Sequence, residues 1–138
     1  MNLKNKNIAF CLTGSFCTFK NTISQMKELV KCNANIIPIM SYNAFKTDTK
    51  YGKASKFVKE IEEITNYKLV HTIKELELVD FNNMINIMII APCTGNTLAK
   101  LNNGIVDSPV LMAVKAHLRN EKPIVVGIST VDGLSRQC

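Results

Sequence analysis

The stretch NIMIIAPCTGNTLAKL, residues 86–101, decides the fold of this chain. An apolar run at residues 87–90 ends at Ala91-Pro92, and five small or polar residues, 93–97, precede a helical pattern. Because proline has no N–H to give to a sheet ladder, we expect the strand to end at Pro92. The glycine, asparagine and threonine that follow suit a tight turn into a helix. Such a segment is typical of a ligand-binding corner in an open α/β sheet, and also of an ordinary strand-to-helix connection.

The rest of the chain repeats this alternation of apolar strands and amphipathic helices. Pro38 indicates that the second strand lies at an edge of the sheet or contains a bend. Residues 41–52 are predicted to form a polar loop. Alternating apolar strands and helices predict an α/β fold, with an open parallel sheet that helices cover on both faces. Strands are expected over residues 7–12, 36–40, 67–71, 85–91 and 123–129, and helices over residues 22–32 with Thr22 or Thr18 as cap, 54–65, 98–102 and 109–119, with a short helical turn within 73–81.

Length and composition indicate one domain over residues 1–138, and the apolar runs are too short for a membrane span of about 20 residues. No secretory signal pattern is visible, so we expect a cytoplasmic protein. Five cysteines, an odd number without a CxxC pair, and two histidines give no metal-ligand spacing and favour reduced, mostly buried thiols. Cys93 is a weak candidate for a reactive thiol because it lies in the loop of the opening stretch.

The formal net charge of +6 suggests a surplus of positive surface. The lysines are scattered along the sequence, and no basic run alternates with aromatic residues, so a nucleic-acid groove is not expected. A solvated surface explains such a surplus, and an anionic cofactor or substrate is the next interpretation.

Polar residues gather where the expected strands end, which is where open α/β sheets bind ligands. Hydroxyls, amides and glycine suit an anion such as phosphate, and without a GxGxxG or GxxxxGK[ST] pattern a mononucleotide fits better than a dinucleotide. We interpret His71 and His117 as structural or solvent-exposed. The candidate residues at the strand ends are Thr13, Gly14, Ser15, Ser41, Asn43, the loop from Pro92 to Thr97, Ser129 and Thr130.

Three motifs carry a resemblance to a known family. LTGS at residues 12–15, APCTGNTLAKL at residues 91–101, then Gly104 and Asp107, resemble the flavoproteins of the homo-oligomeric flavin-containing cysteine decarboxylase group. The signature loop of that group, Pro-Ala-Ser-Ala-Asn-Thr, is matched by PCTGNT with its proline, asparagine and threonine retained. Within the group, the chain is similar along nearly its whole length to the B subunits of dipicolinate synthases, which share the run DSPVLM at residues 107–112.

The resemblance implies a Rossmann-like three-layer fold that binds FMN. It also implies an oxidoreductase role in the mother-cell cytoplasm of a sporulating bacterium, oxidising a small anionic substrate, the dihydrodipicolinate synthase product, to dipicolinic acid. The implied partners are further copies of the chain and a dehydrogenase-like A subunit, through which NADPH would enter. Gly14, Ser15 and Ser41 would then hold the FMN phosphate, and Pro92, Thr94, Gly95, Asn96 and Thr97 would line the isoalloxazine.

Two departures from the group change what is expected. The histidine motif of the decarboxylases has no counterpart in LVDFNNMIN, residues 78–86, and their substrate-clamping cysteine segment is missing, so decarboxylation is not expected. A non-catalytic partner subunit without flavin remains an alternative, as does an FMN-dependent decarboxylase. The ending SRQC, residues 135–138, does not resemble the family's continuation, so we expect a domain truncated at its C-terminal part, with an unpaired edge beside residues 123–129.

Overall fold

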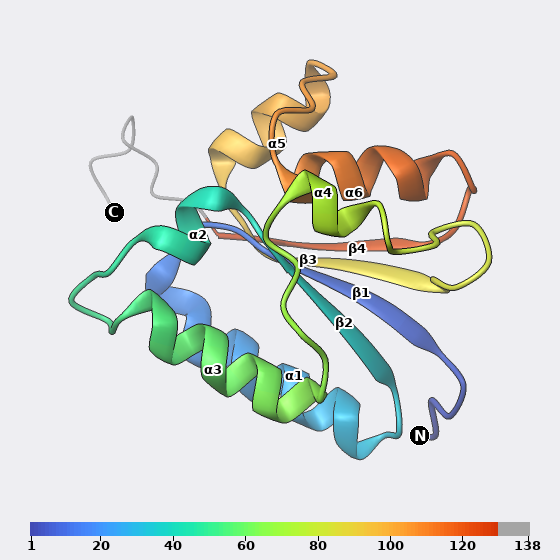
Figure 1. The fold of residues 1–138 in the computed structure, drawn as a ribbon, viewed down its shortest axis with the longest axis horizontal. Helices are drawn as coiled ribbons and strands as arrows, with labels where there is room; N and C mark the ends of the chain where they lie inside the picture. The colour runs from blue at the N-terminus through green and yellow to red at the C-terminus, as the bar shows by residue number, and fades with distance from the viewer. Residues whose placement is uncertain (130–138) are drawn as a thin grey trace.

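The computed structural model describes residues 1–129 as a four-stranded parallel sheet with helices on both faces (Figure 1). This confirms the predicted α/β, Rossmann-like three-layer fold. The strands are β1 (Asn7–Leu12), β2 (Asn35–Met40), β3 (Ile87–Cys93) and β4 (Ile124–Ile128). The helical elements are the 3-10 turn η1 (Phe16–Thr18) and the helices α1 (Phe19–Lys31), α2 (Tyr42–Lys46), α3 (Ala54–Thr65), α4 (Ile73–Leu76), α5 (Gly95–Asn102) and α6 (Pro109–Leu118).

The strand order is β2-β1-β3-β4, so the chain leaves β1 toward one edge and β3 toward the other. Figure 1 shows α1 and α3 on one side of the sheet and α4 and α6 on the opposite side. The point between β1 and β3 where the direction reverses is where open sheets of this kind form a crevice. As Pro38 predicts, β2 lies at an edge of the sheet.

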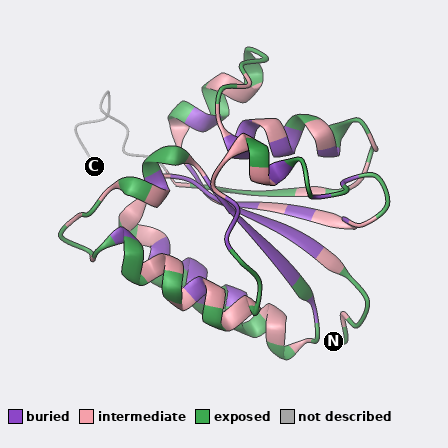
Figure 2. Ribbon diagram, in the orientation of Figure 1, coloured by how far each residue is buried: buried purple, intermediate pink, exposed green. Residues whose placement is uncertain are grey.

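The core is split by the sheet into two apolar layers. Cys11 of β1 is level with Ile39 of β2 and Ile90 of β3, and these buried side chains pack with Val110 and Val114 of α6. The opposite layer contains Phe10 and Leu12 with residues of α1 and α3. Figure 2 shows the buried residues concentrated along β1 and β2, because apolar side chains on both faces of a strand require cover on both faces.

The expectation that helices cover both faces of the sheet is wrong at β4. Val125, Val126 and Ile128 are 55%, 41% and 60% exposed. The buried residues of α6 belong to the layer formed with β3, so this helix covers the centre of the sheet better than its β4 edge. Among the described residues, β4 is therefore an apolar edge strand with little cover.

The predicted strand end at Pro92 is also wrong, because β3 continues through Pro92 to Cys93. The pairing between β3 and β4 is irregular from Ile90 to Cys93, so the ladder passes over a residue that has no N–H. The Ala91-Pro92 peptide bond is cis. The helix α5 then begins at Gly95, three residues earlier than expected, because Thr94 caps it.

Of the two caps expected for α1, Thr18 immediately precedes the helix, whereas Thr22 lies within it and is buried. Two further expectations need correction. The polar segment 41–52 contains the short helix α2, because the Ser41 side chain accepts a hydrogen bond from the Ala44 N–H. Residues 67–71 do not form a strand, since Val70 makes a single bridge with Ile39 at the edge of β2.

The remaining helices agree with expectation within one or two residues, and the turn within residues 73–81 is α4. The predicted edge strand at residues 123–129 is β4. Within residues 1–129, no helix is both long enough and apolar enough to cross a membrane.

The packing of α3 against the sheet predicts the effect of truncating Ile61, which is fully buried. Ile61→Ala is expected to lower the free energy of unfolding by about 2–5 kcal/mol, because it removes buried methylenes and leaves a cavity. Leu78→Ala, at a side chain that is 85% exposed, is the control and should change it by less than about 0.5 kcal/mol. Urea denaturation followed by circular dichroism measures both, and equal losses would contradict this account of the core.

Candidate functional site

The loops after β1 and β3 are joined by one buried side chain, Thr13. Its Oγ1 donates to the Pro92 carbonyl at 2.7 Å and accepts from the Thr94 N–H at 3.0 Å. Its backbone N–H also donates to the Pro92 carbonyl, at 3.0 Å. Thr13 is 2% exposed, so these bonds form away from water and are costly to leave unmade. The two loops on either side of the sheet's reversal point are therefore fixed to each other.

The loops after β2 and β4 are held to the same edge. The Ser41 N–H donates to the Leu12 carbonyl at 3.1 Å, and the Ser129 N–H donates to the Cys93 carbonyl at 2.9 Å. The hydroxyls of Ser15 and Ser129 lie 2.8 Å apart and share a hydrogen bond. All four strand ends thus meet in one polar region, as the sequence predicts for the strand ends.

Three helices begin at a cavity of about 380 Å³, which we call the helix-cap cavity. Its lining includes Ser41, Thr94 and Ser108, the N-cap residues of α2, α5 and α6. Each hydroxyl accepts from the backbone N–H three residues later, at 3.1–3.2 Å. Helix N-termini carry partial positive charge, so their convergence favours an anionic group in this cavity. The other lining residues are Thr13, Gly14, Tyr42, Asn43, Asn96, Thr97, Lys100, Asp107 and Leu111.

Backbone groups are accessible in this cavity. The N–H groups of Gly95 and Asn96, in the first turn of α5, donate no hydrogen bond within residues 1–129. At Gly14, a Cβ atom would lie 2.8 Å from the Asn43 side-chain nitrogen, so a larger residue here would require the Asn43 side chain to move. The site therefore offers unpaired backbone donors beside a glycine turn, which suits a phosphate or carboxylate.

An ion pair lies at the rim of the helix-cap cavity. The Lys100 Nζ is 3.0 Å and 3.1 Å from the two carboxylate oxygens of Asp107. The two side chains are 32% and 55% exposed, so the pair is open to solvent. Lys100 can therefore turn to an anion in the cavity with little loss, because exposed ion pairs are weak.

A second cavity, of about 470 Å³, adjoins the first, and we call it the serine cavity. It shares Gly14, Thr94 and Asn96 with the helix-cap cavity. Both volumes lie within the range of small-molecule sites. The two cavities are two sides of one site, with Asn96 between them. The remaining residues of the serine cavity are Ser15, Phe16, Cys17, Thr49, Tyr51, Gly95 and Ser129.

Seven of the eight candidate cofactor residues line these cavities, and Pro92 is the exception. Its side chain is buried, and its carbonyl holds Thr13. Thr130, named among the strand-end residues, lies outside the described residues. Sequence reasoning missed Lys100 and Ser108, since the Ser108-Pro109 pair predicts a helix start but not the direction in which that helix points. The seven residues are Gly14, Ser15, Ser41, Thr94, Gly95, Asn96 and Thr97.

Neither histidine lines the two cavities. His71 stacks on Phe45, with 3.6 Å between ring centroids, and its Nε2 lies 3.4 Å from Glu75. His117 is fully buried, and its Nε2 donates to the Pro123 carbonyl at 2.9 Å. Among the described residues, the site thus has no imidazole for proton transfer, and its side chains are suited to binding and orienting a ligand.

The expectation of reduced, mostly buried thiols is confirmed only in part. Cys11 and Cys93 are buried, Cys32 is partly buried and Cys17 is exposed, and none of these four forms a disulfide. Burial raises the pKa of the Cys93 thiol, whose Sγ lies 3.7 Å from the Thr94 carbonyl. A reactive thiolate at Cys93 is therefore disfavoured. Within residues 1–129, no three His, Cys, Asp or Glu side chains gather as metal ligands do.

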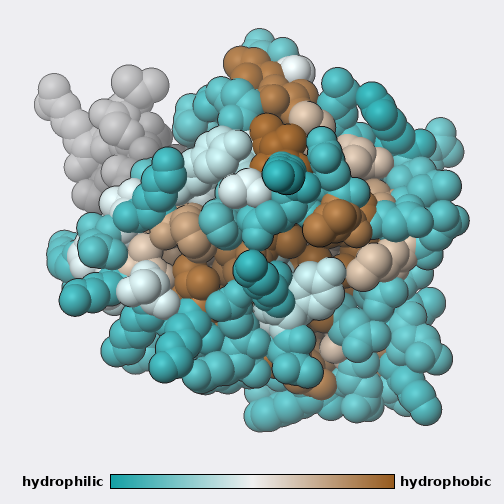
Figure 3. Space-filling model, viewed as in Figure 1, coloured by the Kyte–Doolittle hydropathy of each residue, from teal (hydrophilic) through white to brown (hydrophobic). Residues whose placement is uncertain are grey.

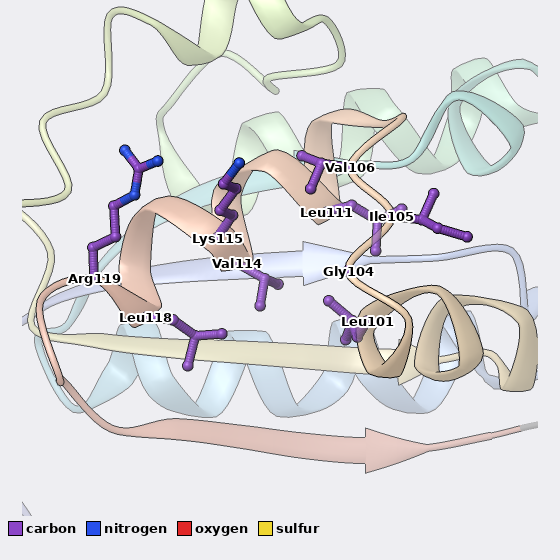
Figure 4. A pocket seen from close by; sticks show the side chains of 9 residues that line it. All are labelled: Leu101, Gly104, Ile105, Val106, Leu111, Val114, Lys115, Leu118 and Arg119. Carbon is purple, nitrogen blue, oxygen red and sulfur yellow. The ribbon is translucent and has the colours of Figure 1, made fainter.

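An apolar groove of about 430 Å³ lies between α5 and α6. Figure 4 shows Leu101, Val114 and Leu118 pointing into it, while Lys115 and Arg119 lie on the outer side of α6. Hydrophobic side chains reach the surface over these two helices (Figure 3), and Leu118 is 58% exposed. Since polar groups are scarce in its lining, the groove suits contact with another apolar surface better than chemistry.

Comparison with known proteins shows which family the chain belongs to. The family model described as Flavoprotein matches residues 1–129. The chain belongs to the Flavoprotein family. It is 44% identical over 133 residues to the B subunit of dipicolinate synthase from Bacillus subtilis, and the match covers 96% of this chain and 66% of that protein.

Solved structures agree with the fold. The crystal structure of the B subunit of dipicolinate synthase from Bacillus halodurans matches with a TM-score of 0.81 and 42% identity, covering 99% of this chain and 70% of that one. A dodecameric FMN-dependent UbiX-like decarboxylase from Escherichia coli matches with a TM-score of 0.73 and 18% identity, covering 94% and 69%. At that identity the second likeness shows the fold alone.

Replacing Thr13 tests whether its hydroxyl fixes the two loops. Thr13→Val keeps the shape but leaves the partly buried Thr94 N–H without a partner, which is expected to cost about 1–3 kcal/mol of stability. Amide hydrogen exchange should become faster in residues 93–98. The control, Thr22→Val, makes the same chemical change within α1 and should leave amide hydrogen exchange in residues 93–98 unchanged. Equal exchange rates in the two variants would show that the Thr13 hydroxyl does not fix the loops.

The cysteine environments predict an order of alkylation. At pH 8 iodoacetamide should modify exposed Cys17 first, because burial raises the pKa of Cys93 and thus lowers its thiolate fraction at that pH. Mass spectrometry of peptides from the folded and the urea-denatured protein measures both rates. Cys93 reacting as fast as Cys17 in the folded protein would mean that the loop exposes its thiol.

Proposed function

We propose that this chain binds FMN and acts as the B subunit of a dipicolinate synthase. Together with a dehydrogenase-like A subunit, it would oxidise the dihydrodipicolinate synthase product, a small anionic substrate, to dipicolinic acid in the cytoplasm of a sporulating cell. The supporting observation is the pair of cavities around Gly14, Thr94 and Asn96 in a chain 44% identical to such a protein. The chain spans 66% of that relative's length.

The residues present fit an FMN phosphate. The N-terminus of α2 at Ser41 and the backbone at Gly14 line the helix-cap cavity, where positive helix ends favour a dianion. Lys100 adds a cation at the rim. Ser15 lines the serine cavity, so it lies on the other side of the glycine turn.

The first turn of α5 fits the edge of a flavin ring. Asn96 is exposed, lies between the two cavities, and carries both an amide donor and an amide acceptor. Gly95 presents its backbone without a side chain, and Thr97 is held by the Thr94 hydroxyl at 2.8 Å. When bound, FMN would take up the hydride that aromatisation of the substrate ring releases. The residues of this chain would hold and orient the ring.

A non-catalytic role as partner subunit is the second candidate. It is favoured by one observation, the absence of a histidine from the lining of both cavities. The same observation gives no support to a decarboxylase of the kind that uses a catalytic histidine. In this second role the chain would shape or stabilise the dehydrogenase-like subunit and hold no flavin.

We also propose that the chain, acting as a single domain, associates with further copies of itself. Two apolar surfaces are exposed to water: the groove between α5 and α6, and the side chains of β4. Burying them against another copy would be favourable. Val126 and Ile128 of β4 lie on the face of the sheet that α6 also covers, so groove and strand can form one continuous contact.

Replacing Asn96 tests the flavin site. Asn96→Ala is expected to weaken FMN binding at least about tenfold, because it removes hydrogen bonds worth about 1.4 kcal/mol in total. Titration of FMN followed by its visible spectrum measures the affinity. The control, Asn102→Ala, changes an exposed amide at the end of the same helix and should bind FMN as the unchanged chain does.

Activity in the complex separates the two candidates. Formation of the aromatic ring is measured with the dehydrogenase-like subunit and each variant, and assembly is checked by size-exclusion chromatography. Loss of activity by Asn96→Ala with assembly intact supports the flavin-binding role. Full activity of Asn96→Ala without bound FMN supports the non-catalytic partner, and activity without this chain at all would rule out both.

A further inference from the structure

The positive charge of the chain is concentrated in one region. Residues 16–60 contain eight lysines and three carboxylate residues, so this third of the sequence holds most of the net charge of +6. Besides β2, it contains η1, α1, α2 and the first half of α3, and Figure 1 shows α1 and α3 on one side of the sheet. Hydrophilic side chains cover the outer side of α3 (Figure 3). Three of these lysines, Lys20, Lys27 and Lys56, line one groove although they are distant in sequence.

A groove of about 510 Å³ lies between α1 and α3 within this region, and we call it the lysine groove. Phe16 and Phe57 are among the residues that line it. Both pack on the buried ring of Phe19, with 5.2 Å between ring centroids in each pair, and Phe57 meets Phe19 edge-on. Tyr51, which is half exposed, adds a third lining ring beside Phe16 and Phe57.

Three lysines also line the groove. Lys27 pairs with Glu60 across the groove at 3.6 Å. Lys20 and Lys56 are exposed and form no ion pair within residues 1–129, so their ammonium groups are free to bind an anion. A fourth ammonium, that of Lys50, lies 5.3 Å from the Tyr51 ring centroid. Charge and aromatic surface thus occur together, and the groove is neither purely apolar nor purely ionic.

The lysine groove opens into the serine cavity. Phe16, Cys17 and Tyr51 line both spaces. Cys17 is exposed, and its Sγ lies 3.9 Å from the Ser15 hydroxyl. A ligand in the groove would therefore lie against this thiol, and its end would reach the edge of the candidate site.

We propose that the lysine groove binds a nucleotide, with its planar base against Tyr51 and Phe57 and its phosphates paired with Lys20 and Lys56. Rings stack on bases, and ammonium groups pair with phosphate oxygens. A nucleic-acid strand fits less well, because the pair of Lys27 and Glu60 crosses the groove and interrupts a basic track along it. The groove is separate from the residues assigned to FMN and its occupation does not depend on the proposed function.

Titration calorimetry with ADP tests the proposal. Removing two lysines that line the groove, Lys20→Gln with Lys56→Gln, is expected to weaken ADP binding at least about tenfold. Lys4→Gln with Lys59→Gln removes the same charge outside the groove and should change the affinity less than about twofold. Pyrophosphate and adenosine, which carry the charge or the ring alone, should each bind more weakly than ADP. Equal losses in the two double variants would show unspecific attraction and overturn the proposal.

Alkylation of Cys17 provides a second measurement that needs no variant. Bound ADP should slow the reaction of Cys17 with iodoacetamide, while Cys32 at the far end of α1 should react at an unchanged rate. ADP binding should also persist in the presence of saturating FMN. No protection of Cys17, or displacement of ADP by FMN, would place ADP outside the groove and overturn the proposal. Failure of FMN to bind would count against the proposed function alone.

Discussion

The site depends on the hydroxyl of Thr13. β1 and β3 are neighbours in the sheet, but the chain leaves them in opposite directions, so no short connection joins the loops that follow. The Thr13 hydroxyl donates to Pro92 in a buried bond and accepts from Thr94 in a partly buried one. Because an unmade bond would cost more here than at the surface, the loops keep one arrangement. That arrangement points the glycine turn at Gly14 and the first turn of α5 at the same space.

The polar character of this space follows from where three helices begin. α2, α5 and α6 start at Ser41, Thr94 and Ser108, and all three caps line one cavity. Each cap satisfies one N–H of its own helix, which leaves other first-turn N–H groups for a ligand. The described site has hydroxyls, amides and a rim lysine but no imidazole. Such a site is suited to binding and orienting an anion.

Much of the fold could be predicted from the sequence, because apolar runs and helical spacing follow from local burial. The predictions that were wrong depend on contacts between residues that are far apart in the sequence. Pro92 lies inside β3 because the pairing with β4 is irregular there, and a proline pattern cannot show that irregularity. The candidate loops were predictable, since strand ends meet at one edge, but the place of Lys100 in that site depends on the direction of α5. In the same way, Lys20 and Lys56 lie on different helices, so only the packing of α1 on α3 makes them neighbours.

The helices α5 and α6 border both the polar helix-cap cavity and the apolar groove. Lys100 and Ser108 face the helix-cap cavity, whereas Leu101 and Leu118 line the apolar groove. Leu111 of α6 lines both spaces. A surface that packs into the groove would therefore contact the same helix, α6, whose N-terminus lies at the helix-cap cavity.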